Sequence, residues 1–267
     1  MNDPQDLEDV IYETANGIAV VTINRPHRYN AFRGRTIDEL IYAFRAAWAD
    51  RSVRCVIFTG AGDKAFCAGG DVKQRAETGD YGPTASGIFE VDYFHRLLRD
   101  IPKPVIAAVN GVAIGGGHVF HVLCDLSIAS ETARFGQAGP RVGSFDAGFG
   151  TTYLARVIGE KRAREMWYLC RDYDAATAER WGLVNQVVPA GELMAEARRW
   201  AGEIAAMSPT AIKFVKHSFN TDTEHQAGLA NVATAALELY ATSPEGTEGA
   251  LAFTEKRSPD FARYVTG

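Results

Sequence analysis

Two glycine-rich segments, each directly after a short apolar run, constrain the fold of this chain more than any other feature. The first is KAFCAGGD at residues 64–71, and the second is NGVAIGGGH at residues 110–118. The apolar runs at residues 54–59 and 105–109 that precede them are typical of buried strands. Because a helix-compatible stretch and a further apolar run follow, the pattern predicts an α/β architecture with mostly buried strands.

The remainder of the chain predicts a hairpin at the start and helices at the end. Apolar runs at residues 10–12 and 18–23 flank Asn16-Gly17, a strong hairpin signal. Helical spacing over residues 37–48 predicts a helix with Thr36 as its N-cap. Beyond about residue 151 the apolar spacing is helical, which predicts three helices, over residues 155–170, 192–207 and 209–219.

Composition excludes several classes of function. Lysine and arginine number 28 against 33 acidic residues, so the chain lacks the basic surplus that nucleic-acid binding needs. There is no apolar run of about 18 residues and no signal-peptide pattern, so we expect a cytoplasmic protein that does not contact the membrane. The four cysteines are scattered, without metal-ligand spacing, and are expected to be buried free thiols: Cys55, Cys67, Cys124 and Cys170.

The glycine loops suit the binding of a negatively charged oxygen. Glycine permits positive φ and lets a ligand approach the backbone closely, and ligands of α/β sheets bind beyond the strand ends. A helix beginning near Gly116 would direct free N–H groups and its positive dipole end at such a ligand. A tight turn with close helix packing is the alternative explanation. Neither loop has the spacing of a nucleotide phosphate motif, which disfavours nucleotide hydrolysis and hydride transfer.

Both loops, together with INRP at residues 23–26 and NAF at residues 30–32, resemble the enoyl-CoA hydratase/isomerase family, the crotonase superfamily. The resemblance covers roughly residues 8 to 264. It implies a crotonase-like spiral of ββα units over residues 1–205 and a helical C-terminal trimerisation region over residues 206–267. It also implies that the N–H groups of Gly70 and Gly116 hold a thioester oxygen as it becomes an enolate.

Further residues are implied to bind coenzyme A, which would enter only as part of the substrate, with no tightly bound cofactor. Near the loops these are Arg28, Ala68, Asp71 and Lys73, with a solvated surface position as the alternative for Arg28. The segment FTEKRSPDF at residues 253–261 resembles the family's tail that packs on a neighbouring subunit. From there Phe253 and Lys256 would reach coenzyme A in trans, within a homotrimer or a homohexamer built as a dimer of trimers.

The two glutamates of a typical family hydratase are replaced here by Val119 and Gly139, neither of which can transfer a proton. The stretch FGQAGPRVGSFD at residues 135–146 instead resembles the subgroup of 1,4-dihydroxy-2-naphthoyl-CoA synthase and 2-oxocyclohexanecarboxyl-CoA hydrolase. Ser144 and Asp146 match the catalytic serine and aspartate of that subgroup. A helix-capping role is the alternative for Asp146.

Three positions bear on the synthase-like chemistry. Gly139 implies room for a bicarbonate that acts as the base, and Tyr81 resembles a tyrosine on the synthase's active-site loop, although an ordinary flexible loop explains residues 78–87 equally well. The synthase's second catalytic tyrosine falls on Ala241, one residue after Tyr240. The segments at residues 30–34, 218–220 and 225–228 are closer to the ring hydrolase.

The sequence therefore predicts an acyl-CoA enzyme that makes or breaks a carbon–carbon bond, most like the synthase. A ring-opening hydrolase is one alternative. A hydratase or isomerase with Asp146 as its sole acid and base is another. A non-enzymatic scaffold that binds coenzyme A or RNA is disfavoured by the net charge of −5 and the intact loops.

Overall fold

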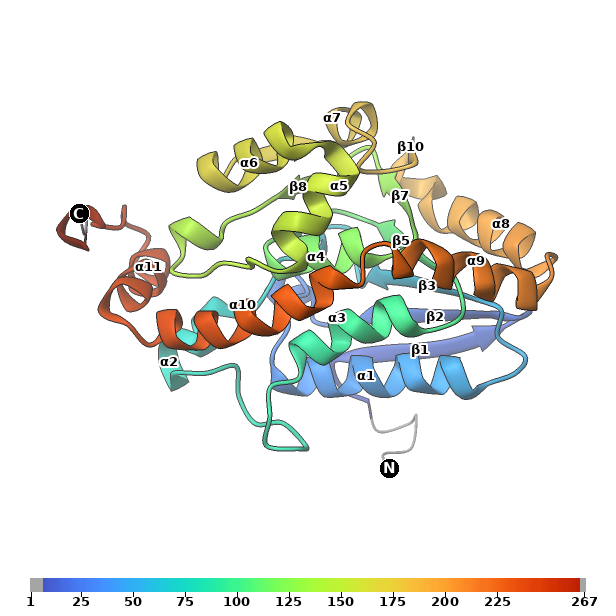
Figure 1. Cartoon of the computed structure of the whole chain (residues 1–267), viewed down its shortest axis with the longest axis horizontal. Coiled ribbons are helices and arrows are strands. Elements are labelled where there is room, and N and C mark those ends of the chain that lie inside the picture. The colour runs from blue at the N-terminus through green and yellow to red at the C-terminus, as the bar shows by residue number, and fades with distance from the viewer. Residues whose placement is uncertain (1–6, 265–267) are drawn as a thin grey trace.

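Two sheets organise the computed structural model, which describes residues 7–264 (Figure 1). The larger sheet has the order β1 (Val10–Ala15), β2 (Ile18–Ile23), β3 (Cys55–Gly60), β5 (Val105–Val109), β7 (Leu126–Ser130) and β10 (Gln186–Val188). The smaller sheet has the order β4 (Ala65–Cys67), β6 (Val112–Ile114), β8 (Arg134–Gly136) and β9 (Asp172–Asp174). Strand pairs are parallel apart from β1–β2 and β8–β9.

A unit of two consecutive strands followed by helix occurs repeatedly along the chain. β3 and β4 lead into α2 (Val72–Thr78) and α3 (Val91–Asp100), and β5 and β6 lead into α4 (Gly116–Leu123). In each repeat the first strand joins the larger sheet and the second joins the smaller one. β7 and β8 begin a third repeat. This arrangement confirms the predicted crotonase-like spiral of ββα units.

The larger sheet is buried on both faces. On β2, Val21 and Ile23 belong to a core shared with α1 (Gly34–Ala49), α3 and α4. Ile18 and Val20 point the other way, toward α8 (Leu193–Ala205). Burial on both faces explains why the strands appear in the sequence as continuous apolar runs rather than as an alternation.

Helices dominate the C-terminal third, as the sequence predicts. They are α5 (Leu154–Ile158), α6 (Glu160–Leu169), α7 (Ala175–Arg180), α8, α9 (Pro209–Thr221), α10 (His225–Ala241) and α11 (Pro244–Thr254). In Figure 1, α9 and α10 cross the front of the molecule and α11 lies beside the C-terminal end. No helix of the described part of the chain is long and apolar enough to cross a membrane. All four cysteines are buried free thiols, as predicted.

Three local predictions are wrong. The first long helix begins at Gly34, so Thr36 is not its N-cap; the Thr36 hydroxyl instead accepts a hydrogen bond from the Arg33 N–H at 3.1 Å. The helix predicted over residues 155–170 is broken at Gly159, whose φ is +84°, and follows a π-helical turn, Phe149–Tyr153. No strand is predicted beyond about residue 151, whereas the short strands β9 and β10 lie there, between the predicted helices.

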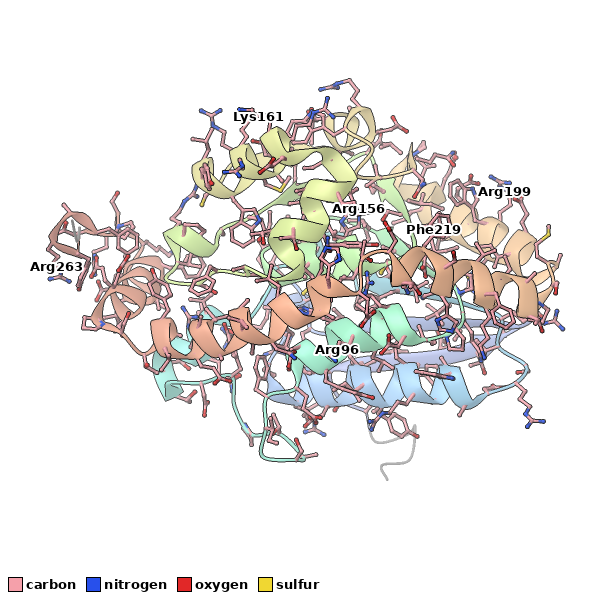
Figure 2. The ribbon with its side chains drawn as sticks, viewed as in Figure 1. Arg96, Arg156, Lys161, Arg199, Phe219 and Arg263 are labelled. Atoms are coloured by element: carbon pink, nitrogen blue, oxygen red, sulfur yellow. The ribbon has the colours of Figure 1, made fainter. Side chains whose placement is uncertain are left out.

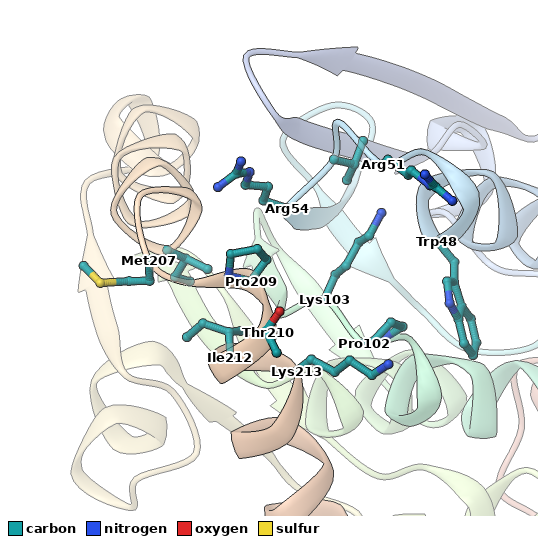
Figure 3. A pocket seen from close by; sticks show the side chains of 12 residues that line it. Trp48, Arg51, Arg54, Pro102, Lys103, Met207, Pro209, Thr210, Ile212 and Lys213 are labelled. Carbon is teal, nitrogen blue, oxygen red and sulfur yellow. The ribbon is translucent and has the colours of Figure 1, made fainter.

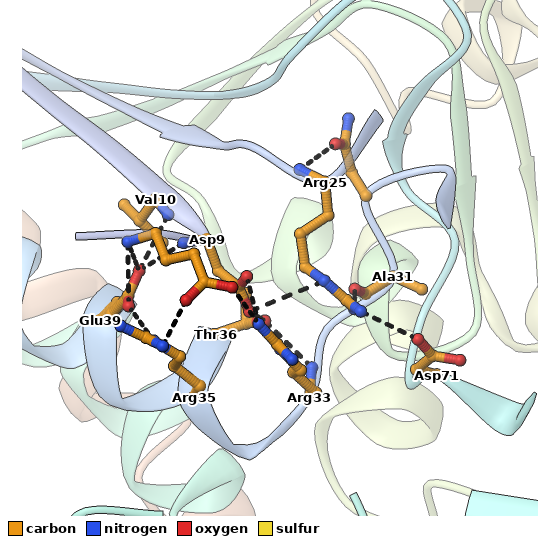
Figure 4. A network of polar contacts seen from close by, with 11 residues as sticks. Asp9, Val10, Arg25, Ala31, Arg33, Arg35, Thr36, Glu39 and Asp71 are labelled. Carbon is orange, nitrogen blue, oxygen red and sulfur yellow. Dashed lines mark hydrogen bonds and ion pairs between the residues drawn. The ribbon is translucent and has the colours of Figure 1, made fainter. Parts of the chain in front are cut away.

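A buried network of charges fixes the N-terminal hairpin and the loop after β2 (Figure 4). The carboxylate of Asp9 accepts hydrogen bonds from Arg33 Nε at 2.8 Å and from the Thr36 hydroxyl at 2.6 Å. Burial alone raises the pKa of Asp9, but these hydrogen bonds hold it below its usual value. Arg25 donates to the Ala31 carbonyl and, through Nη2, to Asp71 Oδ2 at 3.1 Å. The network therefore reaches the residue that follows Gly70.

At the start of α4 the backbone of two segments lies so close together that one added methyl group should lower the stability of the fold. A Cβ on Gly117 would lie 2.0 Å from the carbonyl oxygen of Cys67, at the end of β4. We expect Gly117→Ala to lower the free energy of unfolding by roughly 1–3 kcal/mol, measured by urea denaturation. The matched control is Gly228→Ala in α10, where a Cβ meets nothing within 4 Å and should slightly stabilise the helix. Equal stability of the two variants would contradict the prediction.

Removal of one charge from the buried pair should be costly. The side chains of Arg25 and Asp71 are only 6% and 5% exposed, so Arg25→Met leaves a buried carboxylate without its partner. We expect the free energy of unfolding to fall by about 3–5 kcal/mol. Arg164→Met removes an arginine from an exposed ion pair with Glu160 and should leave stability within error. A loss for Arg25→Met no larger than that of Arg164→Met would refute the role of the buried pair.

Candidate active site

Parallel pairing of β4 with β6 brings the two glycine loops together. Ala65 pairs with Val112 and Cys67 with Ala113, so the segments that follow both strands emerge at the same edge of the small sheet. The contact is close: a Cβ on Gly69 would lie 3.3 Å from the backbone nitrogen of Gly116. Gly69 and Gly115 have φ of +91° and +58°, which favours glycine at both positions.

Two backbone N–H groups at this edge take no part in the hydrogen bonds of the described fold. Within residues 7–264, the N–H groups of Gly70 and Gly116 donate to no acceptor, whereas the adjacent N–H groups of Asp71 and Gly115 bond to the carbonyls of Phe32 at 2.8 Å and Gly136 at 3.1 Å. Gly116 is also the first residue of α4, where the helix dipole favours negative charge. The geometry suits an oxyanion held by two N–H groups.

A cavity of about 110 Å³ opens beside these donors. Its aromatic lining is Phe32, Tyr81, Phe89, Phe145 and Trp167. Its side-chain polar groups, besides the Tyr81 hydroxyl, belong to His95, Gln137, Ser144 and Asp146. Gly70, Gly115, Gly116 and Gly139 supply backbone to the same wall. The residues predicted to be catalytic, Gly70, Gly116, Ser144, Asp146 and Tyr81, therefore converge on one cavity.

The carboxylate of Asp146 has two roles in the structure. Its Oδ1 accepts hydrogen bonds from the N–H groups of Gly148 at 2.8 Å and Gly150 at 3.1 Å, at the start of the π-helical turn. The capping alternative therefore describes a real contact, but the residue also lines the cavity. Among the lining residues in the described chain, Asp146 is the one carboxylate.

The positions of the family's two glutamates carry no acid here. Val119 is completely buried in α4 and does not line the cavity. A Cβ on Gly139 would meet the Ser144 carbonyl oxygen at 2.7 Å and the Trp167 ring at 3.1 Å. The direction of a side chain at Gly139 is therefore already filled.

Tyr81 closes the cavity against the first glycine loop. Its ring packs on Phe89 at a centroid distance of 4.9 Å, and a Cβ on Gly70 would be only 2.6 Å from it. Tyr240 does not line the cavity; its ring lies 5.4 Å from that of Phe145. Leu237 is the residue of α10 that reaches the lining.

A second pocket, of about 300 Å³, shares Gly70 with the first. Five of the residues predicted to bind coenzyme A line it: Arg28, Ala68, Asp71, Lys73 and Phe253. His27, Arg28 and Lys73 supply side chains that suit phosphate groups. Lys256 does not line the pocket. Within one chain Phe253 lines the pocket, since α11 packs against α2, and supply of Phe253 by a neighbouring subunit stays a prediction.

Two of the residues predicted to contact coenzyme A already form hydrogen bonds within the fold. The Ala68 N–H donates to the Tyr29 carbonyl at 3.1 Å, which leaves the Ala68 carbonyl available. Both carboxylate oxygens of Asp71 are engaged, one by Arg25 at 3.1 Å and the other by the Gln74 N–H at 3.2 Å. Asp71 therefore acts mainly by positioning Gly70.

His95, Gln137 and Trp167 also line the cavity, although no role was predicted for them from the sequence. His95 follows Phe94 and precedes Leu97 and Leu98 on the buried side of α3. A histidine within an otherwise apolar helix face was the available signal. Burial lowers the pKa of His95 and the Asp146 carboxylate opposes this, so the net pKa lies below the usual value.

A pocket elsewhere, of about 320 Å³, lacks comparable chemistry (Figure 3). Figure 3 shows cationic side chains around it, Arg51, Arg54, Lys103 and Lys213. Lys103 donates to the Ala47 and Asp50 carbonyls and Arg54 to the Ala205 carbonyl, so two of the cations serve the fold. Across residues 7–264, no group of three or more histidine, cysteine or acidic side chains is placed to hold a metal.

Known proteins of one family match this chain throughout. The model of the family described as "Enoyl-CoA hydratase/isomerase" matches residues 13–263. A crystal structure of an enoyl-CoA hydratase from Mycobacterium avium subsp. paratuberculosis is 29% identical, with a TM-score of 0.85, covering 96% of this chain and 99% of that one. An enoyl-CoA hydratase from Bacillus anthracis is 31% identical, with a TM-score of 0.75, covering 95% and 98% of the two chains. A carnitinyl-CoA hydratase from Mycobacterium avium is also 31% identical, with a TM-score of 0.82 and coverage of 94% and 97%. The chain belongs to the enoyl-CoA hydratase/isomerase family of acyl-CoA enzymes.

Proposed function

We propose that this acyl-CoA enzyme stabilises a thioester enolate and makes or breaks a carbon–carbon bond, most like 1,4-dihydroxy-2-naphthoyl-CoA synthase. One observation carries the proposal. The cavity beside the two free N–H groups contains Ser144 and Asp146, whereas the family's two glutamate positions hold a buried valine and a glycine whose side-chain direction is filled. This combination retains enolate stabilisation and loses the usual means of adding water to a double bond.

The proposed reaction begins with the thioester oxygen between the N–H groups of Gly70 and Gly116. As the α-proton leaves, charge moves onto this oxygen, and each preorganised donor stabilises it by about 3–4 kcal/mol. In ring closure the enolate carbon attacks a second carbonyl. Ser144 and Asp146, beside that carbon, handle the protons of the new alkoxide and of the water that leaves.

Ring opening of a 2-oxocyclohexanecarboxyl-CoA is the second candidate, and one observation favours it. The synthase's second tyrosine is replaced by Ala241, and the neighbouring Tyr240 packs on Phe145 outside the cavity lining. In this direction water adds to the ring ketone and the carbon–carbon bond breaks. Its electron pair then reaches the same thioester oxygen, so the oxyanion donors serve both reactions.

A bicarbonate near Gly139 is a further part of the proposal. The space directly beyond Gly139 is occupied by Ser144 and Trp167, so the anion would have to lie deeper in the cavity, near the Ser144 hydroxyl and the amide of Gln137. Turnover with and without added bicarbonate tests this part alone.

Assembly into a homotrimer, or a homohexamer formed as a dimer of trimers, completes the proposal. Large apolar side chains remain exposed on α9 and α10: Phe214, Phe219 and Leu239 are 66%, 76% and 76% exposed. Figure 2 shows Phe219 on α9 at the outer face of the molecule. These exposed apolar side chains, on consecutive helices, are candidates for a contact between chains.

Sedimentation equilibrium tests the assembly. We expect three or six chains per particle for the wild type and dissociation for Phe219→Asp, because a charge is placed in the contact. Leu169→Asp, at an exposed apolar position on α6, is a control outside this face. A monomeric wild type would remove this part of the proposal.

Turnover of 2-succinylbenzoyl-CoA and of 2-oxocyclohexanecarboxyl-CoA, followed by mass spectrometry, tests the proposed function. Ring closure with loss of water identifies a synthase, and opening to pimeloyl-CoA identifies a hydrolase. Hydration of an enoyl-CoA with neither ring reaction would favour the third candidate, a hydratase with Asp146 as its sole acid and base.

Asp146→Asn separates proton transfer from capping. The amide can still accept from Gly148 and Gly150 but carries no charge, so kcat for the ring reaction should fall by about 10²–10⁴-fold with little change in Tm. Asp174 caps α7 through the Thr177 N–H at 2.8 Å, outside the cavity lining, so Asp174→Asn is the matched control with unchanged kcat. An unchanged kcat in Asp146→Asn would restrict Asp146 to capping.

A further inference from the structure

His95 lies in an unusual position for a buried histidine. The residue is 8% exposed, lines the cavity beside Gly70 and Gly116, and has an Nε2 atom with no hydrogen-bond partner in the described chain. Its ring is held edge-on between Phe120, at a centroid distance of 5.5 Å, and Phe149, at 6.2 Å. A buried nitrogen without a hydrogen-bond partner lowers stability, and a purely structural side chain could avoid that cost.

We propose that His95 is a catalytic base of this cavity. Its Nε2 takes the α-proton of the bound thioester, and the electron pair of that C–H bond moves through the carbonyl to the oxygen held by Gly70 and Gly116. In the reverse step the same nitrogen returns the proton to the α-carbon. The inference rests on the proposed enolate function and names a residue for its first step, as the alternative to a bicarbonate base near Gly139.

Comparison with the other buried histidines supports this assignment. His118 and His121 are completely buried and also have unpartnered nitrogens, so an unsatisfied nitrogen alone does not identify a base. Neither of them lines the cavity, and His118 is paired with Gln137 at 3.2 Å. His95 combines an unpartnered Nε2 with a place in the lining of the cavity.

Charges around His95 suit the transfer of one proton. Burial keeps the imidazole neutral at pH 7 by lowering its pKa, so the free base is ready. Asp146, whose Oδ1 is fixed by two N–H groups, and Asp92 on α3 itself are the charges that act on the ring, and both favour the imidazolium formed by transfer. The cation produced by the reaction is therefore stabilised by a carboxylate that does not have to move.

Exchange of the α-protons of butyryl-CoA in D₂O, followed by mass spectrometry, isolates this step, because butyryl-CoA has no ring to close or open. We expect exchange by the wild type and a loss of at least ~100-fold in His95→Gln, with an unchanged Kd for butyryl-CoA. The matched control is His121→Gln, the same substitution at a buried position outside the cavity, which should exchange like the wild type.

The pH profile supplies a readout that a structural role would not move. Because the pKa of His95 is lowered, its neutral form persists to more acidic pH, so wild-type exchange should be level through neutral pH and fall only below about 6.5. If His95→Gln fails to fold, His95→Ala is assayed with added imidazole, and recovery of exchange supports the base.

The possible failures are distinguishable. His95→Gln that exchanges at the wild-type rate overturns the role of His95 and leaves the proposed function intact. A folded His95→Ala that has lost exchange and is not restored by imidazole also overturns it, because the residue then acts by positioning. A wild type that binds butyryl-CoA without exchange overturns the enolate function and, with it, the base.

Discussion

The pairing of two three-residue strands, β4 and β6, is the interaction on which the site depends. Because the strands are parallel and adjacent, their carboxyl ends deliver Gly70 and Gly116 to the same point from segments more than 40 residues apart in the chain. The fit at this point tolerates no side chain at Gly117. The proposed oxyanion site is thus a property of the backbone, and the surrounding side chains would determine which reaction uses it.

Rigid support for this point comes from both ends of the chain. The buried pair of Arg25 and Asp71 fixes the residue next to Gly70, and the same arginine holds the loop after β2 through the Ala31 carbonyl. On the other side, a Cβ on Gly143 would lie 2.0 Å from the Gly246 carbonyl of α11. The C-terminal helices are therefore part of the architecture of the site as well as candidates for contact between subunits.

Much of the fold was accessible from the sequence because its signals are local. Hydrophobic runs and an Asn-Gly turn predicted the hairpin and β5, and the family resemblance predicted the ββα spiral. The predictions that failed depend on tertiary context. β9 and β10 have three residues each, too few to show a period, and the break at Gly159 requires a positive φ that spacing does not reveal.

The residues of the site also divide into those that local motifs predict and those that depend on tertiary packing. The residues carried by the two loops and by residues 135–146 are found together in the structure because a motif specifies a local backbone shape. His95, Gln137 and Trp167 were missed, since they enter the cavity only through the packing of α3, β8 and α6 around it. Lys256 was expected to reach the pocket for coenzyme A from a neighbouring subunit, which stays a prediction; within its own chain it follows α11 at a φ of +56° and does not line the pocket.

Gly70 belongs to both pockets, and this has a consequence for how specificity is divided. A ligand that spans the two pockets must pass Gly70, which has no side chain and lies beside the Tyr81 ring. In the proposed mode of binding, coenzyme A lies in one pocket and the acyl group in the other, with the reacting carbonyl beside Gly70. Substitutions in the lining of the smaller cavity can therefore change which acyl group is accepted without changing the binding of coenzyme A. A scaffold divided in this way is suited to acquiring new reactions.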